Sequence, residues 1–188
     1  MKKKKLVLIG SSTGGPGHLS KIVSSLDKTY PNTIIIAQHM DALFIDSLAS
    51  RISEQTALQT SVVVQNQTIE PSTIVVTKDL LSQLSFSKQR GLHIVQAQKD
   101  GFFHPSVNSL FCSGALLSEE FEILACLLTG IGTDGANGLL SLKESGAQTL
   151  AESQSSCIVY GMPKAALELG AVERTHTLEE IIEKIRTF

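Results

Sequence analysis

The clearest local signal in the chain is the stretch LVLIGSSTGG, which runs from Leu6 to Gly15. Its apolar half is typical of a buried strand, and its half rich in glycine, serine and threonine is typical of a tight turn. The residues from His18 to Leu26 carry apolar side chains at helical spacing, so we expect a helix behind the turn. A strand, a sharp turn and a helix in this order are typical of an α/β fold.

The turn fits the G-x-S-x-G pattern of a nucleophile elbow, with Ser12 at the centre of residues 10–14. Such a turn presents a serine hydroxyl beside the free backbone N–H groups of a helix N-terminus, which stabilise negative charge. Two other glycine-loop patterns fail, because the glycines lack the G-x-G-x-x-G spacing and Pro16 stands where a phosphate loop requires lysine. Gly-Ser turns after buried strands are common, so the elbow indicates catalysis only if a base and an orienting acid lie nearby.

Strand and helix patterns alternate along the rest of the chain. Strands are expected at 33–37, 61–64, 73–76, 92–95, 121–128, 149–151 and 157–160, and helices at 44–52, 136–144, 162–170 and 178–185, with Ser106 or His104 leading into a further helix. The middle third alternates less regularly, and we expect an antiparallel hairpin there. The pattern predicts a doubly wound, mostly parallel sheet with helices on both faces, and no repeat or linker divides residues 1–188 into more than a single domain.

The composition is that of a globular protein. With 188 residues and 42% hydrophobic side chains the chain can bury a sizeable core, and its net charge of −2 offers no field for nucleic acid or an anionic membrane. No apolar run is long enough to span a bilayer, so we expect no membrane insertion and a cytoplasmic location. Three cysteines without C-x-x-C spacing predict neither a disulfide framework nor a zinc site, and buried reduced thiols are expected at Cys126 and Cys157.

Two further candidates for chemistry, His39 and Asp134, follow predicted strands as Ser12 does. Because ligand sites of doubly wound sheets lie beyond the carboxyl ends of the strands, we expect the three side chains at one edge of the sheet. His39 is then a candidate general base, and Asp134 either orients it or caps the helix that starts at Ala136. Ser11 competes with Ser12 as the nucleophile, although the centre of the elbow favours Ser12.

The other histidines offer less. His18 and His93 lack a setting comparable to that of His39, and His176 lies where it would help to cap the last helix. No pair of histidines or carboxylates has the spacing of metal ligands, so we expect no metal site.

Four motifs together resemble one known family. IGSSTGGP at 9–16, QHM at 38–40, LTGIGTDGANG at 128–138 and GMPKA at 161–165 are similar, in the same order, to motifs of the chemotaxis protein-glutamate methylesterases (CheB). With the apolar strands before them, these motifs cover most of the chain.

The resemblance assigns roles to single residues. It implies that Ser12 is the nucleophile, His39 the base and Asp134 the residue that orients the base, with Thr13 and Ile131 beside the substrate carbonyl. It also implies hydrolysis of glutamate γ-methyl esters on the cytoplasmic domain of methylated chemoreceptors, with release of methanol. Deamidation of receptor glutamines through the same acyl-enzyme is a chemically consistent side activity, and neither reaction needs a metal or organic cofactor.

The chain departs from the family pattern at three places. Ile131 replaces the usual methionine, HPSVN at 104–108 replaces Arg-Pro-Ser-Val-Asp, and TKD at 77–79 replaces a Pro-Gly-Gly-x-His segment. Family members commonly carry an N-terminal receiver domain, and we expect only the catalytic domain in this chain. Two alternatives stay open: a serine hydrolase for another ester or amide, and a non-catalytic receptor-binding module.

Overall fold

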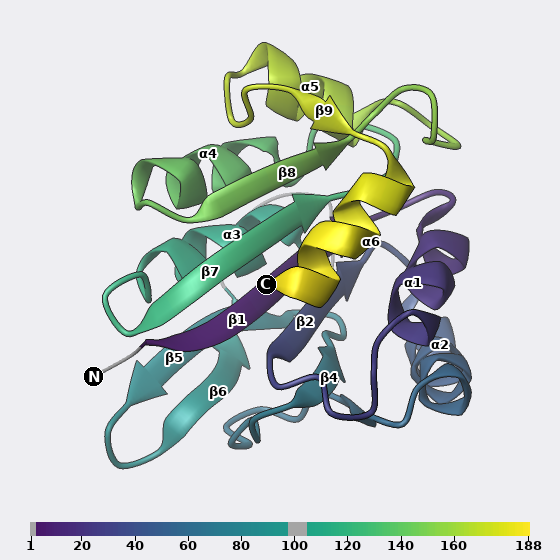
Figure 1. Ribbon diagram of the computed structural model, residues 1–188. Helices are drawn as coiled ribbons and strands as arrows, with labels where there is room; N and C mark the ends of the chain where they lie inside the picture. Colours follow the sequence, from purple (N-terminus) through teal and green to yellow (C-terminus); the bar gives the residue numbers. More distant parts are fainter. Residues whose placement is uncertain (1–2, 98–104) are drawn as a thin grey trace.

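The computed structural model describes residues 3–97 and 105–188, so the expectations for the segment 98–104, including His104, fall outside the described residues. These residues form a seven-stranded sheet in the order β3-β4-β2-β1-β7-β8-β9 and a two-stranded sheet of β5 and β6 (Figure 1). The strands are β1 (Lys4–Ser11), β2 (Thr33–Gln38), β3 (Gln59–Val62), β4 (Thr73–Val76), β5 (Leu81–Ser87), β6 (Gly91–Gln96), β7 (Phe121–Leu127), β8 (Gln148–Glu152) and β9 (Thr175–His176). The helices are α1 (Gly15–Ser24), α2 (Ala42–Gln55), α3 (Val107–Ala115), α4 (Ala136–Glu144), α5 (Met162–Glu168) and α6 (Leu178–Thr187).

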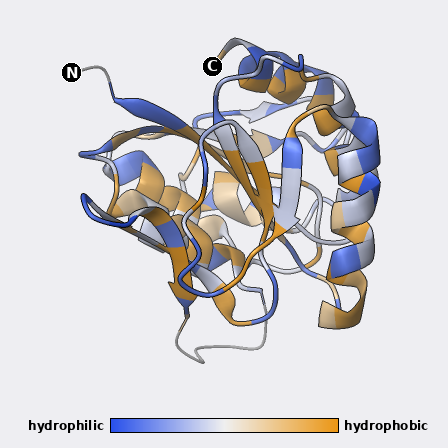
Figure 2. Cartoon of the chain, turned by 90° about the horizontal axis from the view of Figure 1, so that it is seen from below, coloured by the Kyte–Doolittle hydropathy of each residue, from blue (hydrophilic) through white to orange (hydrophobic). Residues whose placement is uncertain are grey.

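The stretch that opens the chain forms the middle of the large sheet. Val7 and Ile9 of β1 pack into a core with helices α1, α2 and α6, whereas Leu6 and Leu8 pack into a second core with α3, α4, α5 and the hairpin. All four side chains are fully buried. A strand that is covered on both faces must be apolar at every position, which explains the uninterrupted run. Figure 2 shows the hydrophobic colour concentrated in the interior and the hydrophilic colour on loops and outer helix surfaces.

The predicted fold class is confirmed. Every strand pairing in the large sheet is parallel, and β5 and β6 form the antiparallel hairpin expected in the middle third. Helix α4 and strand β4 have the predicted bounds, and Ser106 caps α3 by accepting the N–H of Ser109 at 3.2 Å. Strand β5 itself was not predicted, because four of the seven residues in its LSQLSFS sequence are serine or glutamine and the apolar signal is weak.

The strand predicted at 157–160 is wrong. This segment is a loop that contributes one isolated bridge, between Tyr160 and Gly130, and the neighbour of β8 at the sheet edge is β9. Ile158 is 67% exposed, so its apolar character does not reflect burial in the core. Cys157 is only half-buried rather than buried as expected, whereas Cys126 is fully buried and burial raises the pKa of its thiol.

The topology has a switch point at the carboxyl ends of the central strands. From β1 the chain moves through α1 to β2 on one side, and β7 pairs with β1 on the other side. Helices α1 and α3 cover opposite faces of the sheet, so the loops after β1, β2 and β7 diverge at this point. Doubly wound sheets bind their ligands at such a switch point. Within 3–97 and 105–188, no helix has the length and apolar character needed to cross a membrane.

Candidate active site

The turn that carries Ser12 is held by backbone hydrogen bonds on both sides. The Ser12 N–H donates to the Thr129 carbonyl at 3.0 Å, and the Ser12 carbonyl accepts the Gly15 N–H at 2.9 Å. Gly14 has a φ of 85°, and a Cβ at this position would lie 2.7 Å from the Ile158 side chain. The last position of the G-x-S-x-G pattern therefore requires glycine, because the backbone has a positive φ there and because no space is left for a side chain.

His39 and Asp134 are in contact. Nε2 of His39 lies 2.7 Å from Oδ2 of Asp134, and the two side chains are 9% and 5% exposed. Ser12 lies at the neighbouring strand end, because Ser11 pairs with Gln38 in the β1–β2 register and the His39 N–H donates to the Ser11 carbonyl at 2.9 Å. The structure thus brings the three predicted residues to one edge of the sheet.

The suggestion that Asp134 caps the helix starting at Ala136 is wrong. The N-cap of α4 is Gly135, which makes no side-chain cap hydrogen bond. Asp134 instead serves the N-terminus of α3, since its carboxylate accepts the backbone N–H groups of Val107 at 2.7 Å and Asn108 at 3.1 Å. The helix that Asp134 stabilises is thus the one before β7 and not the one that follows Asp134 in the chain.

These contacts set the charge of Asp134. Burial acts to raise the pKa of this carboxyl, but hydrogen bonds from His39, Asn108 and Val107 outweigh burial and hold the pKa below its usual value. The carboxylate is therefore ionised at neutral pH, and His39 donates to it through Nε2. Asn108, where the family pattern has an acid, accepts the N–H of Gly138 through Oδ1 at 2.8 Å and so caps α4 with a neutral group.

Gln38 is a site residue to which no chemical role was assigned from the sequence. Its Nε2 donates to the Ser12 carbonyl at 2.9 Å and to the His39 carbonyl at 2.8 Å. Its Oε1 accepts the hydroxyl of the fully buried Ser11 at 2.7 Å, so Ser11 braces Gln38 and is not presented as a nucleophile. The only available signal was the position of Gln38 in the QHM motif, directly before His39.

The contacts of Gln38 also orient a donor beside Ser12. The Ser12 carbonyl and the Thr13 N–H belong to one planar peptide group and point in opposite directions. Because Gln38 and Gly15 hold the carbonyl, the Thr13 N–H is directed away from them.

The loop after β7 lies against the other side of the turn. A Cβ on Gly130 would come within 2.7 Å of the Ser12 Cβ, so this loop packs directly on the serine. Ile131 follows and is 61% exposed. In the described part of the chain, neither the Thr13 N–H nor the Ile131 N–H donates to a protein acceptor. Both N–H groups are therefore candidates to bind an oxyanion.

Two further histidines differ from expectation. His18, for which no role was expected, is buried, and its Nδ1 lies 3.1 Å from Oε2 of Glu152. The last helix is capped by Thr177 and not by His176.

Across the described ranges, no group of three or more His, Cys, Asp or Glu side chains is arranged to hold a metal ion.

Comparisons with known proteins identify relatives along the whole chain. The sequence matches the family described as CheB methylesterase over residues 7–185. It is 32% identical over 187 residues to protein-glutamate methylesterase/protein-glutamine glutaminase 2 of Carboxydothermus hydrogenoformans, covering 97% of this chain and 52% of that protein. It is 37% identical over 191 residues to protein-glutamate methylesterase/protein-glutamine glutaminase 3 of Shewanella oneidensis, with coverages of 98% and 52%.

The fold has a close structural relative. The crystal structure of the Thermotoga maritima CheB methylesterase catalytic domain matches with a TM-score of 0.90 and 28% identity, and the match covers 99% of both chains. The chain spans about half the length of the curated relatives it matches. The family match runs from β1 into α6 and includes every loop of the candidate site. The chain therefore belongs to the CheB methylesterase family.

Proposed function

We propose that this chain is a serine hydrolase that demethylates glutamate γ-methyl esters on the cytoplasmic helices of chemoreceptors and releases methanol. The observation that carries the proposal is the 2.7 Å contact between His39 and Asp134 at the strand end beside the Ser12 turn. The substrate class follows from the family, whose relatives are named protein-glutamate methylesterases. We further propose that residues 1–188 act as a single catalytic domain in the cytoplasm, where the methylated receptor domain lies.

The first half of the reaction is attack of Ser12 on the ester carbonyl. His39 takes the proton of the Ser12 hydroxyl as the new bond forms. Because its Nε2 donates to Asp134, Nδ1 is the nitrogen that acts as the base. Asp134 keeps this tautomer in place and stabilises the imidazolium that develops, and its hydrogen bonds to α3 keep the carboxylate from turning away.

The oxyanion and the leaving group complete the cycle. The N–H groups of Thr13 and Ile131 stabilise the negative oxygen, a contribution of about 3 kcal/mol per donor. Ile131 acts through its backbone, so isoleucine serves as well as the methionine of the family pattern. His39 returns its proton to the departing methoxide. Methanol is released, and the acyl group stays bound to Ser12 as an acyl-enzyme. Water then attacks the acyl carbon while His39 takes its proton, the bond to the Ser12 oxygen breaks, and His39 returns the proton to Ser12 as the glutamate side chain is released. A receptor glutamine follows the same route, with ammonia as the leaving group.

Methanol release from membranes that carry methylated chemoreceptors tests the proposal. The protein is expected to release methanol, whereas membranes whose receptors were never methylated provide the control and yield none. Two outcomes would favour the alternatives. Hydrolysis of small soluble esters without any release from methylated receptors indicates another serine hydrolase, and receptor binding without turnover of any ester indicates a binding module.

Replacing Gln38 by methionine is expected to lower kcat about 10- to 100-fold with little change in KM. The substitution keeps the volume but removes the donor that orients the Ser12–Thr13 peptide, and the loss of a buried hydrogen bond has about this effect on rate. Steady-state methanol release by the folded variant provides the measurement. Ser11→Ala, which removes only the brace of Gln38, is the matched variant and should retain activity within a few-fold. Equal kcat for Gln38→Met and the wild type would contradict this role.

A further inference from the structure

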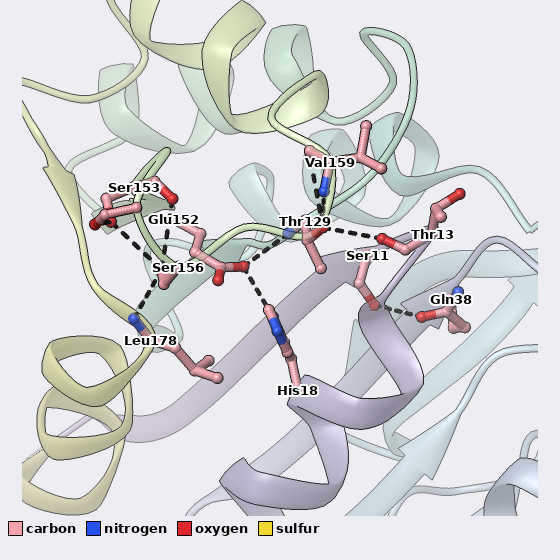
Figure 3. A network of polar contacts seen from close by, with 11 residues as sticks. Ser11, Thr13, His18, Gln38, Thr129, Glu152, Ser153, Ser156, Val159 and Leu178 are labelled. Carbon is pink, nitrogen blue, oxygen red and sulfur yellow. Dashed lines mark hydrogen bonds and ion pairs between the residues drawn. The ribbon is translucent and has the colours of Figure 1, made fainter.

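A buried carboxylate lies behind the catalytic turn and has no part in the mechanism above. Glu152 ends β8 and is fully buried. Its Oε2 accepts the backbone N–H of Thr129 at 2.9 Å and lies 3.1 Å from Nδ1 of His18 (Figure 3). Burial of a carboxylate is costly unless the group is paired and hydrogen-bonded, so packing alone favours an apolar side chain at this position.

Thr129 links this carboxylate to the turn. Its carbonyl accepts the Ser12 N–H at 3.0 Å, and its hydroxyl donates to the Thr13 carbonyl at 2.9 Å and accepts the Val159 N–H at 2.9 Å. The residue is fully buried and has no room to adjust by rotation into solvent. Glu152 thus contacts Thr129, and Thr129 in turn contacts the backbone of Ser12 and Thr13. The position of the Ser12 and Thr13 backbone therefore depends on the position of Thr129.

His18 connects the same carboxylate to the opposite side of the turn. It lies in α1, the helix that begins directly after the turn, and its side chain is 8% exposed. A single oxygen of Glu152 thus contacts the loop after β7 and the helix after β1 (Figure 3). The turn between these two elements is held from both ends through one side chain.

We propose that Glu152 is a positioning residue for the hydrolysis. Through Thr129 and His18 it holds the Ser12 and Thr13 backbone where the hydroxyl can attack and the N–H can receive the oxyanion. The inference rests on the proposed function, because it takes Ser12 to be the nucleophile. A displacement of about 1 Å in such an arrangement costs about 10²-fold in rate. Glu152 is fully buried and does not reach a bound substrate, so the effect falls on kcat and leaves KM unchanged.

The test measures the rate at which a fluorophosphonate labels Ser12, which requires no receptor. We expect Glu152→Ala to slow labelling about 10- to 100-fold. Glu152→Gln keeps one oxygen at the place of Oε2, where it can accept both the Thr129 N–H and a proton on Nδ1 of His18, so this variant should label within about threefold of the wild type. Glu122→Ala, at a 42% exposed glutamate on β7, is the matched control and should be unaffected. Rates are compared per folded molecule, with circular dichroism giving the folded fraction.

Methanol release provides the second readout. Glu152→Ala should lower kcat without a change in KM, and Glu152→Gln should restore kcat. If Glu152 only stabilised the fold, the folded fraction of Glu152→Ala would have the kcat of the wild type. Equal labelling rates for wild type and folded Glu152→Ala would overturn the inference and leave the proposed function standing. A wild type that is not labelled at Ser12 would overturn both.

A second variant covers the case in which Glu152→Ala does not fold. Thr129→Val keeps the shape of the linking residue and removes its hydroxyl contacts to Thr13 and Val159. It should slow labelling about tenfold, and an unchanged rate would overturn the link from Thr129 to Thr13 on which the inference draws.

Discussion

Replacing Ser12 by alanine is expected to lower kcat for methanol release by about four to six orders of magnitude. Alanine has no hydroxyl to attack the ester, so no acyl-enzyme forms and water must react directly. The turn should persist, because its backbone hydrogen bonds to Thr129 and Gly15 do not involve the side chain. The measurement is methanol release from methylated receptor membranes, together with labelling by the fluorophosphonate, which Ser12→Ala should abolish.

Ser11→Ala is the control for this experiment. It removes a neighbouring hydroxyl that donates to Gln38 inside the protein, so it tests whether any serine in the turn would suffice. Its kcat should stay within a few-fold of the wild type, and its labelling should persist. Undiminished methanol release by Ser12→Ala, with loss of activity in Ser11→Ala, would contradict the assignment of Ser12 and identify Ser11 as the nucleophile.

Replacing Asp134 by asparagine is expected to lower kcat about 10⁴-fold. The amide no longer stabilises the charged imidazole of His39 and does not select its reactive tautomer. It also faces the N–H groups of Val107 and Asn108, where one of its two polar ends is a donor rather than an acceptor. Leaving a buried N–H without an acceptor costs about 1–3 kcal/mol, so the free energy of unfolding should fall as well.

The pH dependence of stability gives a separate check. The pKa of Asp134 is held below its ordinary value of 3.8, so ionisation of this group stabilises the folded state. That contribution is complete above the ordinary pKa and is lost as the pH falls through the lower pKa of the folded state. The difference in unfolding free energy between wild type and Asp134→Asn should therefore be constant near neutral pH and shrink below about pH 3.8.

Urea unfolding at a series of pH values and constant ionic strength measures this difference. Asp41→Asn is the matched control, because Asp41 is the exposed N-cap of α2 and asparagine caps a helix equally well. It should change neither kcat nor stability appreciably. A stability difference for Asp134→Asn that grows on acidification would contradict the charge state assigned to Asp134.

Local patterns were sufficient where burial itself dictates residue type. The runs at 6–9 and 34–37 are apolar at every position because both faces of their strands are covered, and this requirement predicted a parallel sheet between two helical layers. The same reasoning failed at 157–160, where an apolar run has no neighbouring strand and lies along the loop after β7. Periodicity reports the character of a segment but not which partners are present.

The sequence by itself predicted which residues carry the chemistry. A serine, a histidine and an aspartate each follow a strand, and parallel pairing brings the ends of these strands to one edge of the sheet. Tertiary structure alone decided which groups hold them. Asp134 serves the helix that precedes its strand, and Glu152 reaches His18 across 134 positions of sequence. The physical reason is that such hydrogen bonds join residues from different βα units, and their partners are set by how the strand ends meet in three dimensions.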